Sequence, residues 1–229
     1  MTPAATGANR PETAEHSGVP PSVASSEVSD RQWFIVGRRQ EFAGEARTNV
    51  LRIAAIGSFY AIELLNYYGL ELGPLQMPAS VDKEFHAVIT CLAVAWTMVS
   101  LGTLLCLRLR IFPAALKYVT TASDLMLLTT TLVVAYGPRS PLVVAYFLVI
   151  AVSALRFCLS LVWFATLGSL AGYLLLAGYA RWFASARDLS VPRYQQLIFL
   201  TALLLTGVIL GQVVRRARAM AEEFSVRIR

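Results

Sequence analysis

The sequence is poor in charged residues. Only 15% of its 229 residues are Asp, Glu, Lys or Arg, whereas 56% are hydrophobic. A soluble domain carries about 25% charged and about 45–50% apolar residues, and a domain of this size must present a polar surface to water. The shortage of charge therefore excludes a disordered protein, a coiled coil and an ordinary soluble enzyme. It indicates that lipid is the solvent for much of the surface.

Cysteine and histidine are also scarce. Cys91, Cys106 and Cys158 lie inside apolar stretches and have neither the spacing of metal ligands nor that of a disulfide framework. Only one of the two histidines, His86, lies in the apolar part of the chain, which excludes a haem held between two histidines there. The motifs of zinc proteases, serine hydrolases, P-loop proteins and dinucleotide-binding proteins are missing. We therefore expect no enzyme activity, no cofactor and no metal site.

What the sequence does contain is a series of long apolar stretches. A helix needs about 20 mostly apolar residues to cross the hydrocarbon core of a bilayer. Six stretches meet this requirement, near residues 49–70, 86–107, 117–136, 141–157, 159–180 and 195–214. The predicted fold class is all-α, a polytopic membrane bundle of six helices. The boundary between the fourth and fifth spans is only Arg156 and a short turn.

The basic residues predict the orientation of the bundle. Most of those near the membrane precede the first span, follow the second span or follow the last one. The positive-inside rule then places both termini in the cytoplasm. The net charge of +6 is thus a sign of orientation rather than of nucleic-acid binding. We expect a disordered tail over 1–30, a juxtamembrane amphipathic segment over 31–48, and a basic amphipathic tail over 215–229 that continues the last helix.

Polar side chains inside apolar spans are candidates for a functional site, because they are costly in lipid and usually face the bundle interior. Arg52, Tyr60 and Glu63 follow helical spacing on one stripe of the first span, and Asn66 lies beside it. Glu63 has no basic residue at its own depth. It either makes a structural hydrogen bond between helices or forms part of a ligand or proton site that opens outward near His86.

A second group of charges is expected close to the cytoplasmic face. Asp124 follows Lys117 by seven residues, which places it about 10 Å from that face. Arg156 follows Pro141 by fifteen residues, which places it about 8 Å from the same face. We therefore predict an ion pair between Asp124 and Arg156, with Arg52 as a competitor or third member. Both a structural and a functional role are compatible with such a pair.

Four glycines carry packing information. Gly168 and Gly172 in the fifth span, and Gly207 and Gly211 in the sixth, form GxxxG patterns. This spacing lets helix backbones approach closely in lipid. The patterns are compatible with packing inside one bundle and with a homodimer formed through the last helix.

The stretch from Asp124 to Tyr173 contains D-L-x-L-L-T-T, G-P-R-S-P-L, Y-F-L-V-I and A-L-R-F, and it ends in G-Y. It resembles the multi-helix N-terminal membrane domain of bacterial sensor histidine kinases and of similarly anchored nucleotide cyclases and Ser/Thr kinases. The chain also resembles small planctomycete-type membrane proteins of this length. Because the chain ends at Arg229 without a catalytic domain, the resemblance implies a sensing or anchoring role and a separate cytoplasmic signalling partner.

Two classes of function predict different interiors. A sensory or anchoring module should be a dry, packed bundle that dimerises through its last helix. A small transporter or channel should contain a continuous polar cavity that reaches both Glu63 and Asp124. A third possibility, an accessory subunit of a larger membrane complex, predicts an exposed polar or glycine-rich face.

Overall fold

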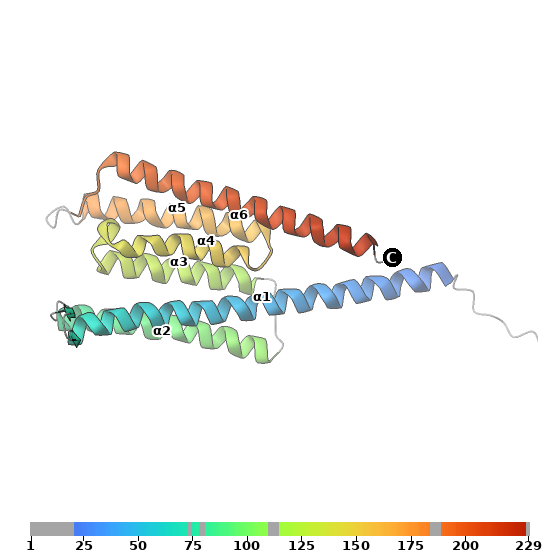
Figure 1. Ribbon diagram of the computed structural model, residues 1–229, viewed down its shortest axis with the longest axis horizontal. Coiled ribbons are helices and arrows are strands. Elements are labelled where there is room, and N and C mark those ends of the chain that lie inside the picture. The colour runs from blue at the N-terminus through green and yellow to red at the C-terminus, as the bar shows by residue number, and fades with distance from the viewer. Residues whose placement is uncertain (1–20, 73–74, 78–80, 110–114, 184–188, 228–229) are drawn as a thin grey trace, which may run out of the picture. The chain divides into compact units, whose positions relative to one another are not determined.

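The computed structural model describes the backbone of most of the chain and the side chains of a smaller part (Figure 1). The backbone is described over 21–72, 75–77, 81–109, 115–183 and 189–227. Side chains are described from residue 44 onward within these ranges, except at 70–77, 222 and 224–227. The chain divides into two compact units, Met1–Arg39 and Gln40–Arg229. Every contact reported below lies within the second unit.

Helices dominate the described residues, which confirms the predicted all-α class. The helices are α1 (Pro21–Tyr68), α2 (Lys83–Arg108), α3 (Leu116–Val134), α4 (Ala145–Ala154), α5 (Leu159–Trp182) and α6 (Arg193–Arg227). Two short 3₁₀ turns, η1 (Gly137–Arg139) and η2 (Pro141–Val144), connect α3 to α4. A two-stranded antiparallel hairpin, β1 (Leu70–Leu72) with β2 (Leu75–Met77), connects α1 to α2, and the sequence patterns had not predicted it.

The two terminal helices extend beyond the predicted spans. α1 begins at Pro21 and so includes residues 21–30, for which the composition predicts disorder. Residues 1–20 of that predicted tail lie outside the described part of the chain, as do the side chains of the amphipathic segment before Gly44. α6 runs on to Arg227, through most of the segment 215–229.

Four of the described helical segments are long and apolar enough to cross a membrane: Gly44–Tyr68, Lys83–Arg108, Leu159–Trp182 and Arg193–Ala221. Many of their large apolar side chains are exposed, among them Leu197, Ile198 and Leu205 on α6. The third and fourth predicted spans are not among the four. α3 has 19 residues and carries a lysine, an aspartate and five threonines, which lower its hydropathy. The fourth is a shorter apolar segment, Pro141–Ala154, because α4 ends at Ala154, before the turn at Phe157.

The threonines of α3 are compatible with an apolar environment because their hydroxyl groups are satisfied locally. Thr129, Thr130 and Thr131 each donate a hydrogen bond to the carbonyl four residues earlier. Thr121 does the same to Lys117. A hydroxyl bonded to its own helix needs no partner elsewhere.

The core lies among α3, α4, α5 and α6, and α5 packs against the other three. Leu132, Tyr146, Ile150, Val162 and Leu203 are fully buried there. α1 differs from these helices, because within the described residues its backbone makes few close approaches to any other element. Side chains rather than close backbone packing therefore connect α1 to the bundle.

The four predicted packing glycines all contact neighbouring helices of the same chain. A Cβ on Gly168 would overlap the side chain of Leu125 on α3, and one on Gly207 would overlap Thr166 on α5. A Cβ on Gly172 would lie 2.9 Å from both the Thr129 and the Tyr146 hydroxyl oxygens, and one on Gly211 would lie 3.4 Å from Leu159. These glycines hold α3, α4, α5 and α6 together, and the glycine face of α6 is occupied by α5.

Candidate functional site

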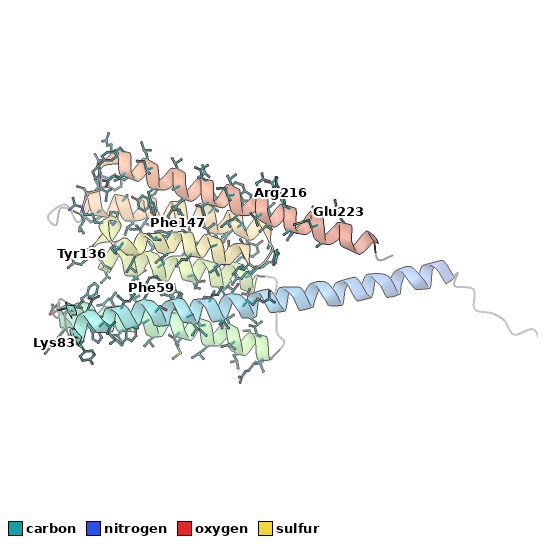
Figure 2. All side chains as sticks on the ribbon, in the orientation of Figure 1. Phe59, Lys83, Tyr136, Phe147, Arg216 and Glu223 are labelled. Carbon is teal, nitrogen blue, oxygen red and sulfur yellow. The ribbon has the colours of Figure 1, made fainter. Side chains whose placement is uncertain are left out.

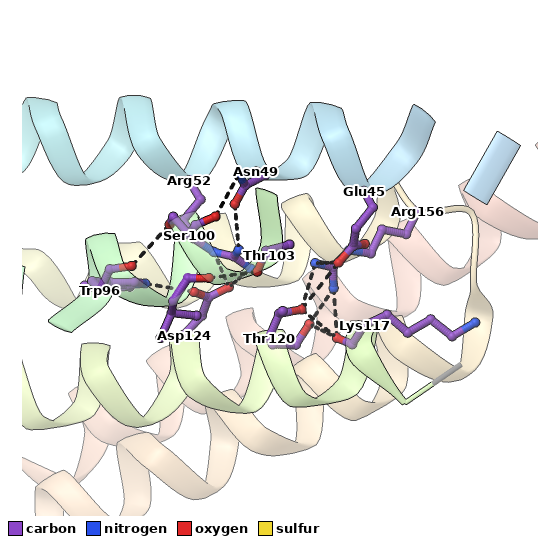
Figure 3. Close-up of polar contacts among 12 residues, drawn as sticks. Glu45, Asn49, Arg52, Trp96, Ser100, Thr103, Lys117, Thr120, Asp124 and Arg156 are labelled. Atoms are coloured by element: carbon purple, nitrogen blue, oxygen red, sulfur yellow. Dashed lines mark hydrogen bonds and ion pairs between the residues drawn. The ribbon is translucent and has the colours of Figure 1, made fainter. Parts of the chain in front are cut away.

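The first polar cluster joins α1, α2 and α3 through Arg52, Trp96 and Asp124 (Figure 3). Asp124 on α3 accepts two hydrogen bonds from Arg52 on α1 at its Oδ2, from Nε at 3.0 Å and from Nη2 at 2.7 Å. Its Oδ1 accepts a third from the indole Nε1 of Trp96 on α2 at 2.8 Å. Arg52 also donates to Asn49, which in turn donates to the carbonyl of Ser100. The paired charges are thus fully engaged, as buried charges require.

The second cluster lies where α4 ends. Arg156 forms an ion pair with Glu45 on α1: its Nη2 donates to Oε1 at 2.8 Å, and its Nε lies 2.6 Å from Oε2. The same guanidinium donates to the hydroxyls of Thr120 and Thr121 and to the carbonyl of Lys117 on α3. The Arg156 and Glu45 side chains are only 5% and 2% exposed, so this nearly buried cluster ties α1 to α3 and to the end of α4.

The turn between α4 and α5 places Arg156. Phe157 adopts a left-handed backbone conformation, with φ of +49°, which is uncommon for a bulky residue. Arg218 on α6 donates from its guanidinium to the Phe157 carbonyl. The predicted short turn at this boundary is confirmed, and α6 helps to stabilise it.

The predicted Asp124–Arg156 pair is wrong. Asp124 binds Arg52, the residue expected only as a competitor or third member, and Arg156 binds Glu45. The depth argument placed the charges near one level, but the predicted first span began at residue 49 and so left out Glu45. Extending the polar stripe of Arg52 upstream by 3 and 7 residues would have found Asn49 and Glu45. Nothing in the sequence pattern singles out Trp96.

The third cluster lies at the other end of α1. Glu63 forms a hydrogen bond with His86 on α2, in which Oε1 lies 2.8 Å from Nδ1. The Tyr67 ring stacks on the His86 imidazole at a centroid distance of 4.0 Å. One turn earlier, the Tyr60 hydroxyl bonds that of Thr90 at 3.2 Å. The prediction that Glu63 lies near His86 agrees with this geometry, although Tyr60 and Tyr67 do not bond Glu63 in any contact of the described residues.

A cavity of about 840 Å³ lies between α1 and the neighbouring α2, α3, η2 and α4. Its volume is within the range of about 300–1,000 Å³ found for small-molecule sites. Apolar side chains form most of the wall, including Ile56, Phe59, Ile89, Leu92, Leu148 and Val149. Arg52 and Asp124 line one end of the cavity and Glu63 lines the other. Figure 2 shows Phe59, one of the apolar lining residues, on α1.

The cavity brings together most of the polar residues that the sequence singled out. Those that line it are Arg52, Tyr60, Glu63, Asn66, Asp124 and Arg156. His86 does not line it but contacts it through Glu63. The glycines Gly168, Gly172, Gly207 and Gly211 lie elsewhere, within the helix packing described above.

Most of the charged groups around the cavity are paired with one another. Within the described residues, no group of three or more His, Cys, Asp and Glu side chains comes together as metal ligands. Arg52, Asp124, Arg156 and Glu45 are paired with one another, so none is presented as a free acid or base. Among the carboxylate oxygens of the described residues, the Oε2 of Glu63 is buried and has no hydrogen-bond partner there.

The comparisons with known proteins assign no family. No family model, no curated protein and no solved structure matches the chain.

Proposed function

We propose that this chain is a six-span membrane protein of the bacterial inner membrane with both termini in the cytoplasm. In this proposal it is a non-catalytic sensory or anchoring module, and its input is a membrane-soluble amphiphile that binds in the cavity beside α1. Four described helices meet the length and hydropathy of membrane spans. α3 and α4 pack against α5, which supports a crossing by these two helices as well.

The observation that carries the proposal is how α1 borders the cavity. Polar contacts hold α1 at both ends of the cavity, through Glu45–Arg156 and Arg52–Asp124 at one end and Glu63–His86 at the other. A molecule that binds in the cavity between α1 and α4 can contact α1 and leave the core among α3, α4, α5 and α6 intact. A ligand shifts a conformational equilibrium only by its different affinity for the two states. We therefore expect α1 to be the element whose position reports occupancy to a cytoplasmic partner protein.

The cavity departs from the dry, packed interior that the sequence analysis expected of a sensory module. Transport is therefore a second candidate, because the cavity reaches both Glu63 and Asp124, as a transporter or channel would need. Its walls are largely apolar and its charges are paired, which favours an amphiphile over a hydrated ion. Net transfer of a charged dodecyl compound across protein-containing vesicles, absent from empty vesicles, would favour transport over sensing.

A homodimer or a larger complex would have to use a face of α6 that is not already packed within the chain. The Gly207–Gly211 face of α6 contacts α5 of the same chain. A dimer through α6 would therefore use another face, such as the one that exposes Leu197 and Ile198. The same exposed surface is where lipid or another subunit of a membrane complex would pack.

Filling the cavity tests the proposed function. Ala55 lines the cavity from α1, whereas its neighbour Ala54 is exposed and does not line it. The probe is a photoreactive dodecanol, added to purified protein in phosphatidylcholine nanodiscs, and the labelled peptides are mapped by mass spectrometry. We expect Ala55→Trp to remove most labelling of the cavity walls and the matched control Ala54→Trp to leave it unchanged. Equal labelling of the two variants, or none in the wild type, contradicts the proposed site.

A further inference from the structure

We infer that the ligand of this cavity is a single-chain amphiphile with a cationic amine head group, and that Glu63 binds the amine through its free carboxylate oxygen. This inference rests on the proposed function, since it requires that the cavity binds an amphiphile. It goes further because it names the head group, the end of the cavity where it binds and the residue that recognises it.

The geometry of Glu63 is the first step. Its side chain is only 10% exposed, and it lines the cavity. Oε1 is 2.8 Å from Nδ1 of His86, whereas Oε2 is buried without a partner among the described residues. A buried acceptor without a partner is costly and uncommon in native structures. A donor group on a ligand in the cavity would satisfy it.

The charges around the cavity are the second step. Two acidic residues, Glu63 and Asp82, line the end near His86. The basic residues that line the cavity are Arg52 and Arg156, and both are already paired with carboxylates at the opposite end. Glu63 follows Arg52 by eleven residues on α1, a distance of about 16 Å along the helix. The end near Glu63 thus favours a cation and disfavours a carboxylate or a phosphate.

His86 does not remove this preference. Its contact with Glu63 is an ion pair only when the imidazole is protonated. Oε1 can keep its contact with Nδ1 while an amine that enters beside Glu63 binds Oε2. The stacked Tyr67 ring holds the imidazole in place.

The apolar walls explain why the cation should carry a chain. Ile56 and Phe59 on α1 face Leu148, Val149 and Val152 on α4 across the cavity between Glu63 and the Arg52–Asp124 pair. These side chains offer an alkyl chain an environment as apolar as the lipid that it leaves, whereas a compact hydrated cation would find no polar partners along this wall. An amine at Glu63 would therefore place its chain along α1 towards Arg52.

The test compares head groups on one chain. Photoreactive dodecanol labels the protein in phosphatidylcholine nanodiscs, and unlabelled dodecylamine, dodecanol and dodecanoate compete with it. We expect dodecylamine to compete about tenfold better than dodecanol, the gain of one charge-assisted hydrogen bond, and dodecanoate to compete worse than both. In Glu63→Gln the advantage of the amine should disappear while competition by dodecanol persists. Glu84→Gln, an exposed carboxylate outside the cavity, is the matched control and should keep the advantage.

The outcomes separate the two proposals. If dodecanol labels the cavity but the amine competes no better than the alcohol, or keeps its advantage in Glu63→Gln, the amine inference is refuted and the proposed function stands. If dodecanol does not label the cavity of the wild-type protein, the proposed function itself fails. If Glu63→Gln does not fold, the ratio of amine to carboxylate competition in the wild type decides, and a ratio near one overturns the inference.

Discussion

Replacing Asp124 with Asn should destabilise the protein strongly, because Asp124 compensates a buried cation. The side chains of Arg52 and Asp124 are 4% and 13% exposed. Asp124 accepts three hydrogen bonds, two from Arg52 and one from Trp96. An asparagine at this position keeps the shape but removes the charge, which leaves the guanidinium of Arg52 buried without a counter-ion.

The expected magnitude follows from that burial. Removing one partner of a buried ion pair costs about 3–5 kcal/mol. For a chain of this size, 1 kcal/mol corresponds to about 2–4 °C in Tm. The lower estimate for Asp124→Asn is thus a fall of about 6–12 °C. The exposed control Glu84→Gln should change stability by less than about 0.5 kcal/mol.

The assay is thermal unfolding of detergent-solubilised protein, followed by the loss of monodisperse protein on size exclusion. A double-mutant cycle assigns the partner, since coupling between contacting residues is about 0.5–3 kcal/mol. Asp124→Asn combined with Arg52→Gln should cost clearly less than the sum of the single changes. The combination with Arg156→Gln should be closer to additive. Stronger coupling of Asp124 to Arg156 than to Arg52, or a Tm of Asp124→Asn equal to that of the control, would refute the reasoning.

Two further predictions concern packing and topology. Gly207→Leu should destabilise the α5–α6 contact by about 1–3 kcal/mol because it overpacks the position against Thr166. The control Gly57→Leu, with open space around it, should not destabilise the protein. Thermal unfolding measures both variants, and equal effects would contradict the packing. In intact cells, a membrane-impermeant thiol reagent should label Lys83→Cys and not Arg216→Cys in a background without the native cysteines, because the proposed orientation places only Lys83 outside; the reverse pattern would invert the topology.

The sequence predicts the helical and apolar character of the chain well because both depend on local composition. The apolar stretches of the first, second, fifth and sixth spans coincide with the four helices that are long and apolar enough to cross a membrane. The hairpin of Leu70–Leu72 with Leu75–Met77 was not predicted. Its two strands are only three residues each, too short for an alternation of polar and apolar residues to stand out.

The sequence predicted several members of the candidate site, but it missed Glu45 and Trp96 and did not predict which charges pair. The polar stripe of Arg52, Tyr60 and Glu63 does face one cavity, since spacing along a helix defines which residues share a face. The partner of Asp124 depends on how the helices are rotated about their axes and on which one lies nearest, and neither is encoded in depth along a span. Trp96 was missed because a single aromatic residue in an apolar helix has no distinguishing spacing.

The sequence alone thus determined that the chain is helical and apolar and which polar residues share a face of the first span, because hydropathy and helical spacing are properties of a segment by itself. Only the tertiary structure decided that Arg52 binds Asp124, that Glu45 binds Arg156, and that the glycines of α6 contact α5. It alone also revealed the cavity beside α1 and the oxygen of Glu63 that has no partner among the described residues. Cavities and pairings are relations between helices, and these arise only when the helices pack.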